Sequence, residues 1–296
     1  MQPKKSLGQN FLRDEKVLEK IIKAADLKAT DFVLEVGPGE GALTKELIKY
    51  AKKVIAIEKD NNLALRLDSR LRGNDKIKII SGDILEINLP DLLRHSERGG
   101  AKSKNLLKNT TGYATKKILR LRPSTDSAQN DALNYKVVAN IPYYITSPII
   151  RLFLETAYPP QVMILMVQRE VAERICASSG QHSILSISVQ YYAQPEILFN
   201  VNKESFWPVP EVDSAVIKII PNKKNIPQED VKKFFRIVRA GFSAKRKTLA
   251  NNLATGLQID KKIVEQLLKT VGFLPTVRAQ ELGVADWKKL VALLSN

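Results

Sequence analysis

Cysteine and histidine are nearly absent from this chain of 296 residues. It contains one cysteine, Cys176, and two histidines, His95 and His182. A single cysteine excludes an intramolecular disulfide and fits a reducing compartment. Three such residues are also too few for a metal site built from histidine and cysteine. We therefore expect a protein without a bound metal, in which Cys176 is a core residue of a helix.

Long apolar runs are missing as well. No stretch approaches the ~20 apolar residues that a membrane-spanning helix needs. The basic residues at the amino terminus are not followed by the apolar segment of a signal peptide. We expect a cytoplasmic protein that does not bind membranes. Because no extended dimer seam is visible in the pattern, we also expect a monomer.

Acidic residues are outnumbered throughout the chain. Lys and Arg total 47 against 31 Asp and Glu, which gives a net charge of +16. Because each neutralised phosphate releases counterions, such an excess favours a polyanionic partner, although a basic surface can also serve solubility alone. The excess is strongest over residues 223–296, which hold 15 Lys or Arg and 6 Asp or Glu. This helical tail is either an RNA-facing domain or simply a solvated helix surface.

Strand and helix patterns alternate along most of the chain, after a first amphipathic helix at 14–27. The alternation predicts an α/β fold in which a parallel sheet carries helices on both faces. We expect this domain to span residues 1–222, with a late strand at 215–219, and a small all-helical domain to span 223–296. Strands are predicted at 31–37, 54–58, 77–80, 136–139 and 162–167, and helices at 42–50, 63–71, 148–154 and 170–177.

One stretch interrupts the alternation. Residues 92–133 are polar and basic and lack sustained periodicity. Connections this long without secondary structure are functional or disordered. We expect a disordered insertion that loops out from the surface, with accessory RNA contact as the alternative.

A glycine-rich turn and two acidic residues follow the first three predicted strands. The turn is Glu35-Val-Gly37-Pro-Gly39-Glu-Gly41, and its glycines allow a ligand to approach the backbone closely. Its spacing departs from the G-x-G-x-x-G fingerprint of nicotinamide enzymes, which argues against an oxidoreductase. Glu58 stands where an acid binds ribose hydroxyls, and Asp83 is placed to accept from an adenine amine. Each acid alone could be a helix cap, but together they predict a site for S-adenosyl-L-methionine.

Asn140-Ile141-Pro142-Tyr143 follows the fourth predicted strand directly. The amine of adenine is a poor nucleophile because its lone pair is conjugated with the ring. Two acceptors, the Asn140 side chain and the Ile141 carbonyl, can hold both N–H groups, while Pro142 fixes the chain. Tyr143 can stack on the base. The segment therefore predicts methylation of a planar amine by positioning and electrostatics, although a plain β-turn would use similar residues.

An aromatic and proline-rich segment, residues 206–214, precedes the late strand. Phe206 can close the second face of a flipped base and complete an aromatic sandwich. Alternatively, Phe206 and Trp207 cap the core.

The whole pattern resembles the small-subunit ribosomal RNA adenine N6,N6-dimethyltransferase family, whose relatives include the macrolide-resistance rRNA methyltransferases and mitochondrial transcription factor B. The resemblance covers the chain except for the insertion, which is longer than the family usually has. The matching segments are residues 5–12, 35–44, Glu58, 82–83, 140–144, 168–172, 206–214, 242–253 and 278–282.

The resemblance implies further properties. The fold is expected to be the Rossmann-like sheet of the class I methyltransferases. Asn10 and Leu12 are expected to join Glu35, Gly37, Gly39, Glu58, Asp83 and Asn140 around the cofactor. The implied reaction is two methyl transfers to each of two adjacent adenosines, in a hairpin loop near the 3′ end of small-subunit (16S) rRNA. The implied substrate is an immature ribosomal subunit rather than naked RNA. Two alternatives are a large-subunit rRNA methyltransferase of the resistance type, which the tail segments 245–249 and 278–282 oppose, and a non-catalytic RNA-binding assembly factor.

Overall fold

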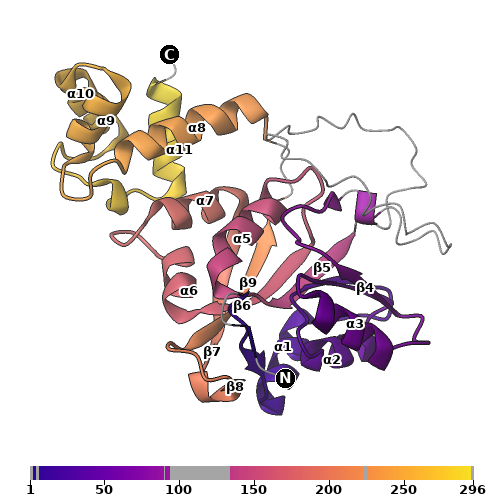
Figure 1. The fold of residues 1–296 in the computed structure, drawn as a ribbon. Helices are drawn as coiled ribbons and strands as arrows, with labels where there is room; N and C mark the ends of the chain where they lie inside the picture. The colour runs from indigo at the N-terminus through magenta and orange to yellow at the C-terminus, as the bar shows by residue number, and fades with distance from the viewer. Residues whose placement is uncertain (1–2, 5–6, 90, 94–133, 223–225, 295–296) are drawn as a thin grey trace.

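A seven-stranded sheet forms the centre of the molecule, with the strand order β4-β3-β2-β5-β6-β9-β7 (Figure 1). The computed structural model describes residues 3–4, 7–89, 91–93, 134–222 and 226–294. Strands β2 to β6 are parallel, and β9 is antiparallel to both of its neighbours. The predicted α/β fold is therefore confirmed. The strands are β2 (Phe32–Val36), β3 (Lys53–Glu58), β4 (Ile77–Ser81), β5 (Tyr135–Asn140), β6 (Val162–Gln168), β7 (Ala193–Val201) and β9 (Ser214–Pro221).

The order of the sheet explains where a ligand can bind. From β2 the chain runs outward through β3 to β4, and then returns to build β5 and β6 on the other side of β2. In open parallel sheets, ligands bind beyond the carboxyl ends of the strands at the point where the order reverses. That point lies between β2 and β5.

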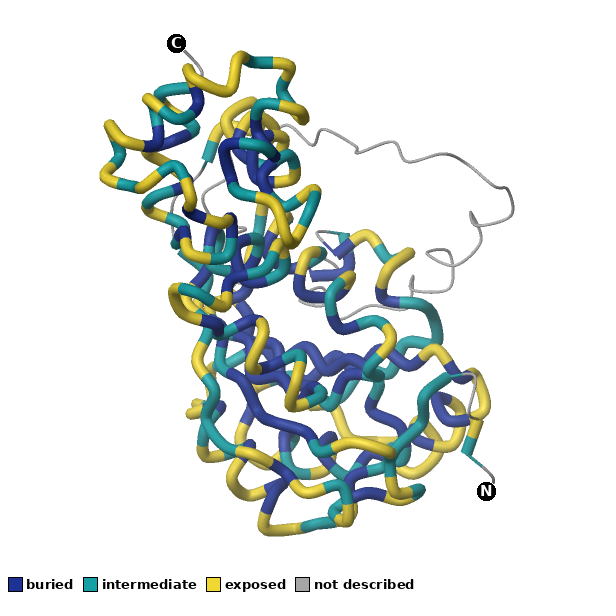
Figure 2. The backbone as a smooth tube through the Cα atoms, turned by 90° about the vertical axis from the view of Figure 1, so that its left-hand side faces the viewer, coloured by how far each residue is buried: buried dark blue, intermediate teal, exposed yellow. Residues whose placement is uncertain are grey.

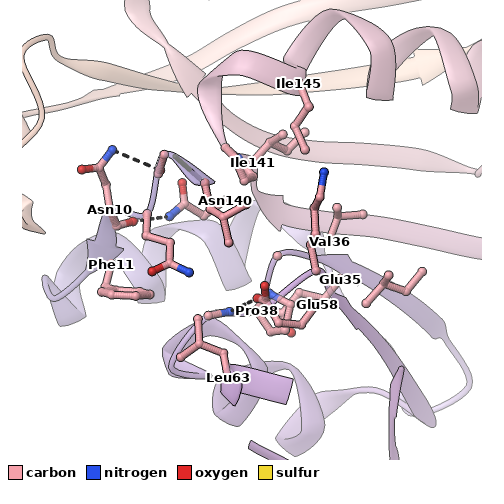
Figure 3. Close-up of a pocket in the computed structure, with 18 of the residues that line it drawn as sticks. Asn10, Phe11, Glu35, Val36, Pro38, Glu58, Leu63, Asn140, Ile141 and Ile145 are labelled. Atoms are coloured by element: carbon pink, nitrogen blue, oxygen red, sulfur yellow. Dashed lines mark hydrogen bonds between the residues drawn. The ribbon is translucent and has the colours of Figure 1, made fainter. Parts of the chain in front are cut away.

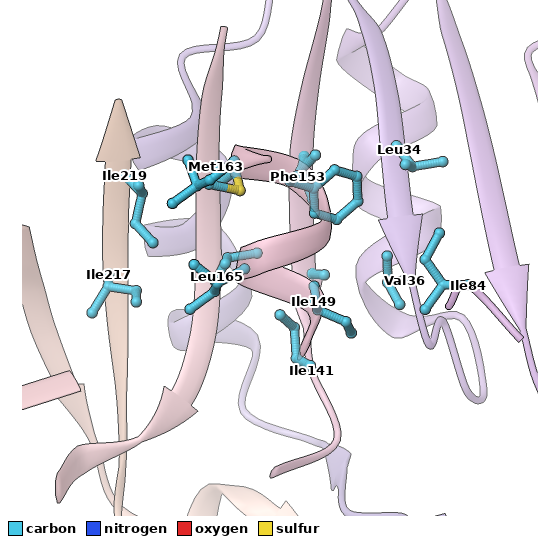
Figure 4. Packing of buried hydrophobic residues seen from close by; sticks show 14 of the residues in the cluster. Leu34, Val36, Ile84, Ile141, Ile149, Phe153, Met163, Leu165, Ile217 and Ile219 are labelled. Atoms are coloured by element: carbon cyan, nitrogen blue, oxygen red, sulfur yellow. The ribbon is translucent and has the colours of Figure 1, made fainter. Parts of the chain in front are cut away.

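Helices cover both faces of the sheet because alternate strand residues point to opposite sides. In β2, Leu34 and Val36 pack with Phe153 on one face of the sheet (Figure 4). Val33 belongs to the cluster on the other face, together with Leu47. The first face carries α5 (Thr146–Leu154), α6 (Arg169–Ile175) and α7 (Ile184–Tyr192), and the second carries α1 (Glu15–Ala25) and α2 (Ala42–Tyr50), while α3 (Asn61–Arg70) packs beside β3 and β4.

Helices α8 to α11 form a separate cluster beyond α7 (Figures 1 and 2). Its core surrounds the fully buried Trp287 and includes Ile187 and Tyr191 from α7. The tail is thus helical as predicted over the residues that the structure describes. The helices are α8 (Gln228–Gly241), α9 (Leu249–Leu257), α10 (Lys261–Val271) and α11 (Val284–Leu294).

Three features differ from the sequence prediction. Helix α7 and strand β7 were not predicted; β7 is an edge strand, half-buried and interrupted by Pro195 and a bulge, so its alternation is weak. A two-stranded sheet pairs β1 (Phe11–Leu12) with β8 (Phe206–Trp207), which no local pattern indicates. The core also extends to Leu92 and Leu93, both buried, so the predicted insertion begins too early.

Residues 94–133, on which the rest of the predicted insertion falls, lie outside the described residues. Within the part of the chain that is described, no helix has the length and apolar character that crossing a membrane requires.

Candidate active site

A pocket lies at the carboxyl ends of β2, β3, β4 and β5, with the segment 7–12 along its side (Figure 3). The structure brings together all the residues predicted for the cofactor and all those of the Asn-Ile-Pro-Tyr segment. The predicted residues that line the pocket are Asn10, Leu12, Glu35, Gly37, Gly39, Glu58, Asp83, Asn140, Ile141, Pro142 and Tyr143.

The glycine turn follows β2 in a conformation that side chains rarely adopt. Gly37 and Gly39 have φ angles of 68° and 58°. A Cβ atom on Gly39 would lie 3.0 Å from the ring of Phe11, which also lines the pocket. The turn therefore leaves room in the pocket, and its Gly37 and Gly39 N–H groups donate to the Ile57 carbonyl and to Glu58.

Glu58 is held rigidly at the end of β3. Its Oε2 accepts from the Gly39 N–H at 3.0 Å, and its Oε1 accepts from the Asp60 N–H at 2.8 Å. Burial raises the pKa of this carboxyl, while the two backbone hydrogen bonds act in the opposite direction. Each carboxylate oxygen has a second lone pair. Glu58 therefore presents a fixed acceptor to the pocket, as binding to ribose hydroxyls requires.

Glu35 is the most unusual group in the pocket. It is 1% exposed, and its Oε2 has no hydrogen-bond partner among the described residues. Burial, assisted by the nearby Glu58, raises the pKa of Glu35 to about 8. Thr44 beside it acts in the opposite direction on this pKa. A buried carboxyl oxygen without a partner suits a ligand that brings a donor or a positive charge. S-adenosylmethionine, which carries both a sulfonium and an ammonium group, fits that requirement.

Asp83 follows β4 and forms an ion pair with Lys59, a residue that no sequence motif indicates. Its Oδ2 lies 2.8 Å from the Lys59 Nζ, and its Oδ1 accepts from the Leu85 N–H at 3.0 Å. Burial alone would raise the pKa of Asp83, but these contacts outweigh it and the pKa is lowered. Asp83 is therefore an ionised acceptor. Lys59 lies next to Glu58 in the sequence, and only that adjacency could have indicated it.

The segment 7–12 is fastened to the pocket from several directions. Asp60 accepts from the Gln9 Nε2 at 3.1 Å and pairs with the Lys4 Nζ at 2.8 Å. Gln9 and Phe11 line the pocket but were not predicted, although they flank Asn10 and Leu12 in one of the family-like segments.

Asn140 is oriented by the same amino-terminal segment. Its Nδ2 donates to the Asn10 carbonyl at 3.2 Å (Figure 3). Because a carbonyl oxygen only accepts, this contact assigns the amide nitrogen and leaves the Asn140 Oδ1 for a ligand. The Ile141 N–H donates to the Met166 carbonyl at 3.2 Å, which ties the segment to the end of β6.

Tyr143 is fixed at both ends. Its hydroxyl lies 2.6 Å from the Ser214 Oγ, and its carbonyl accepts from the Thr146 hydroxyl at 3.1 Å. The ring is thereby held at the pocket wall, and burial raises the pKa of its hydroxyl.

Phe206 does not line the pocket, contrary to the expectation that it forms the second wall of a base site. It is 3% exposed and belongs to the core cluster that contains Leu12 and Leu18. The cause is strand geometry: Phe206 pairs with Leu12, and both side chains point into the core, whereas Phe11 and Trp207 point to the other face. The alternative, that Phe206 caps the core, describes the structure better.

Known proteins are similar to this chain in sequence and in fold. The family model described as "Ribosomal RNA adenine dimethylase" matches residues 1–296. The chain is 40% identical to "Ribosomal RNA small subunit methyltransferase A" of Dehalococcoides mccartyi over 98% of this chain and 88% of the relative. It is 36% identical to the protein of the same name from Leuconostoc mesenteroides, over 100% and 91%.

Solved structures agree with these sequence matches. A dimethyladenosine transferase from Plasmodium falciparum is 27% identical, with a TM-score of 0.70 over 96% of this chain and 97% of that one. The 23S rRNA methyltransferase ErmE shares the fold, with 24% identity and a TM-score of 0.69 over 97% and 100%. From the full-length family match and the curated relatives, the chain belongs to the ribosomal RNA adenine dimethylase family.

Proposed function

We propose that this enzyme transfers methyl groups from S-adenosylmethionine to the N6 atoms of two adjacent adenosines, in a hairpin loop near the 3′ end of 16S rRNA, during assembly of the small ribosomal subunit. The observation that carries the proposal is the joint orientation of Asn140 and the glycine turn toward one pocket. Family membership supports rRNA adenine dimethylation in general, and the names of the curated relatives support the small subunit.

Cofactor binding is assigned to the loops after β2, β3 and β4. Glu58 would hold the ribose hydroxyls, and Asp83 would accept from the adenine amine. Glu35 would face the positively charged part of the cofactor, beside Asn10 and the turn formed by Gly37 and Gly39. When bound, S-adenosylmethionine supplies an electrophilic methyl group on a sulfonium.

The target amine is assigned to the loop after β5. The Asn140 Oδ1 and the Ile141 carbonyl would accept its two N–H groups and so localise the nitrogen lone pair. Tyr143, fixed through Ser214, would pack on the ring of the base. This arrangement needs no strong general base, because the amine proton can leave to water after the new bond forms. Positioning and electrostatics account for the rate.

We assign different roles to the sheet domain and to the helical tail. Residues 1–222 would carry the chemistry, and residues 223–296 would contact rRNA. The basic excess of the tail and its separate core around Trp287 support this division.

Labelled methyl transfer to unmethylated small subunits tests the proposal. We expect the wild-type protein to modify two adjacent adenosines, located by mass spectrometry of rRNA fragments. Asn140→Ala should lower kcat by roughly 100-fold or more, because one of the two acceptors for the amine is lost.

Large subunits serve as the control substrate. Equal transfer by the wild type and Asn140→Ala would contradict the assigned site. Methyl groups found only in large-subunit rRNA would support the resistance-type alternative instead.

A further inference from the structure

The outer face of the β1–β8 ribbon carries an exposed tryptophan. Alternation sends Leu12 and Phe206 into the core and leaves Phe11 and Trp207 on the other side, as Cα partners of one another. Trp207 is 45% exposed, whereas its neighbour Phe206 is buried. Large aromatic side chains usually bury most of their area, so an indole exposed to this degree next to a substrate pocket requires an explanation.

Two neighbours hold the indole in a defined place. The Phe11 ring lies 6.4 Å from the Trp207 ring, with an interplanar angle of 23°. The Arg13 guanidinium lies 5.8 Å from the centre of the indole. Arg13 is itself fixed, since its backbone N–H donates to the Ser205 carbonyl at 2.8 Å and its side chain pairs with Glu40 at 2.6 Å. These partners cover Trp207 only in part, so a rigid aromatic surface remains open to solvent.

This surface borders the pocket at two points. Phe11 and Glu40 both line the pocket, and they contact Trp207 and Arg13, respectively. Val209 and Val212, which are close to Trp207 in the sequence, are also 56% and 44% exposed. A polynucleotide whose target base enters the pocket would therefore pass over Trp207 with the adjoining nucleotide.

We propose that Trp207, with Arg13 beside it, is a stacking platform for the unpaired base that adjoins the target adenosine. The inference rests on the proposed function. A nucleotide turned into a pocket leaves its neighbour without a stacking partner, and proteins that bind single-stranded RNA replace that partner with aromatic rings and guanidinium groups. Because the β1–β8 ribbon already orders the indole, little conformational entropy is lost when a base binds to it.

For two adjacent target adenosines, the platform has a particular consequence. While one adenosine occupies the pocket, the base stacked on Trp207 is its neighbour in the loop. Loss of the platform should therefore weaken binding of the particle and leave more particles modified at only one of the two adenosines.

Steady-state kinetics with unmethylated small subunits test this assignment. We expect Trp207→Ala to raise the KM for the particle on the order of tenfold, with kcat and the Kd for S-adenosylmethionine within twofold of the wild type. Trp207→Phe should recover most of the loss. Tyr50→Ala removes another half-exposed aromatic side chain, at the far end of α2, and should change none of these values.

Ultraviolet crosslinking of the wild-type complex supplies the second measurement. A crosslink between Trp207 and the rRNA loop supports the platform. A crosslink from Trp207 to a ribosomal protein, or an unchanged KM for Trp207→Ala, would overturn it. Either result leaves the proposed function standing if the wild type still methylates the subunit; absence of transfer by the wild type would refute the proposed function itself.

Discussion

The two sides of the pocket are built on different principles. On the side proposed for the cofactor, Glu35 and Glu58 lie at the ends of β2 and β3, and Asp83 follows β4. Nearby backbone N–H groups hold Glu58 and Asp83. On the side proposed for the substrate, the side chains are oriented by residues that are distant in sequence. Asn140 is oriented by Asn10, and Tyr143 is oriented by Ser214. The cofactor side is mainly local in sequence, whereas the substrate side is assembled by long-range contacts.

This difference indicates how each side responds to mutation. A change on the cofactor side alters the charge of a buried, preformed site. A change on the substrate side alters the packing that joins distant segments, so stability and activity are coupled there. Substitutions in each region test this difference.

The largest effect is expected for Phe206→Ala, in the core shared with Leu12, which belongs to the segment that orients Asn140. Removal of this buried ring leaves a cavity against Leu12 and should lower the free energy of unfolding by roughly 3–5 kcal/mol. Chemical denaturation measures this loss, with Phe206→Leu as the milder control. A variant with unchanged stability but a much lower kcat would contradict the core assignment and restore Phe206 as a wall of the base site.

A smaller effect, confined to the cofactor side, is expected for Glu35→Gln. With its pKa raised to about 8, Glu35 is protonated in the folded free protein at neutral pH but ionised in the unfolded chain. The contribution of this carboxyl to the free energy of unfolding is therefore largest below its ordinary pKa of 4.5. That contribution is lost as the pH rises to about 8, because only the unfolded chain releases the proton in this range. From about pH 5 to about pH 9, this loss should amount to roughly 2–4 kcal/mol in the wild type.

Glu35→Gln should abolish most of that pH dependence, which denaturation at several pH values measures. The exposed Glu19→Gln on α1 is the matched control and should behave as the wild type does. Parallel pH curves for Glu35→Gln and the wild type would show that Glu35 is ionised in the folded state.

The smallest effect is expected for Tyr143→Phe. It removes the hydroxyl that bonds the Ser214 Oγ, and Ser214 is fully buried, so the free energy of unfolding should fall by about 1 kcal/mol. Cofactor affinity should stay within twofold, because the hydroxyl points to β9 rather than to the cofactor loops. Ser214→Ala should cost a similar amount, and the double variant should cost less than the sum of both. Additive losses would mean that the two hydroxyls do not interact.

The same contrast explains what the sequence could predict. The acids and glycines of the cofactor side occur at strand ends, and apolar periodicity locates those ends. Phe206 was placed in the site because an aromatic residue near prolines resembles a base wall, but its direction depends on the pairing with Leu12, which is remote in sequence. Strand β7 is not predicted because its edge position weakens the alternation of apolar and polar residues. Leu92 and Leu93 fall within the predicted insertion because two adjacent apolar residues are too few to show a helix or strand periodicity.

The β1–β8 ribbon also has a consequence for the order of events during synthesis. The segment that bounds the pocket and orients Asn140 is translated before its pairing partner at 206–207, which is made only after every strand of the seven-stranded sheet except β9. Domains fold from the amino terminus as they emerge. The pocket of the nascent protein therefore stays incomplete until residues 206–207 have been made, although the loops after β2 to β5 are already present.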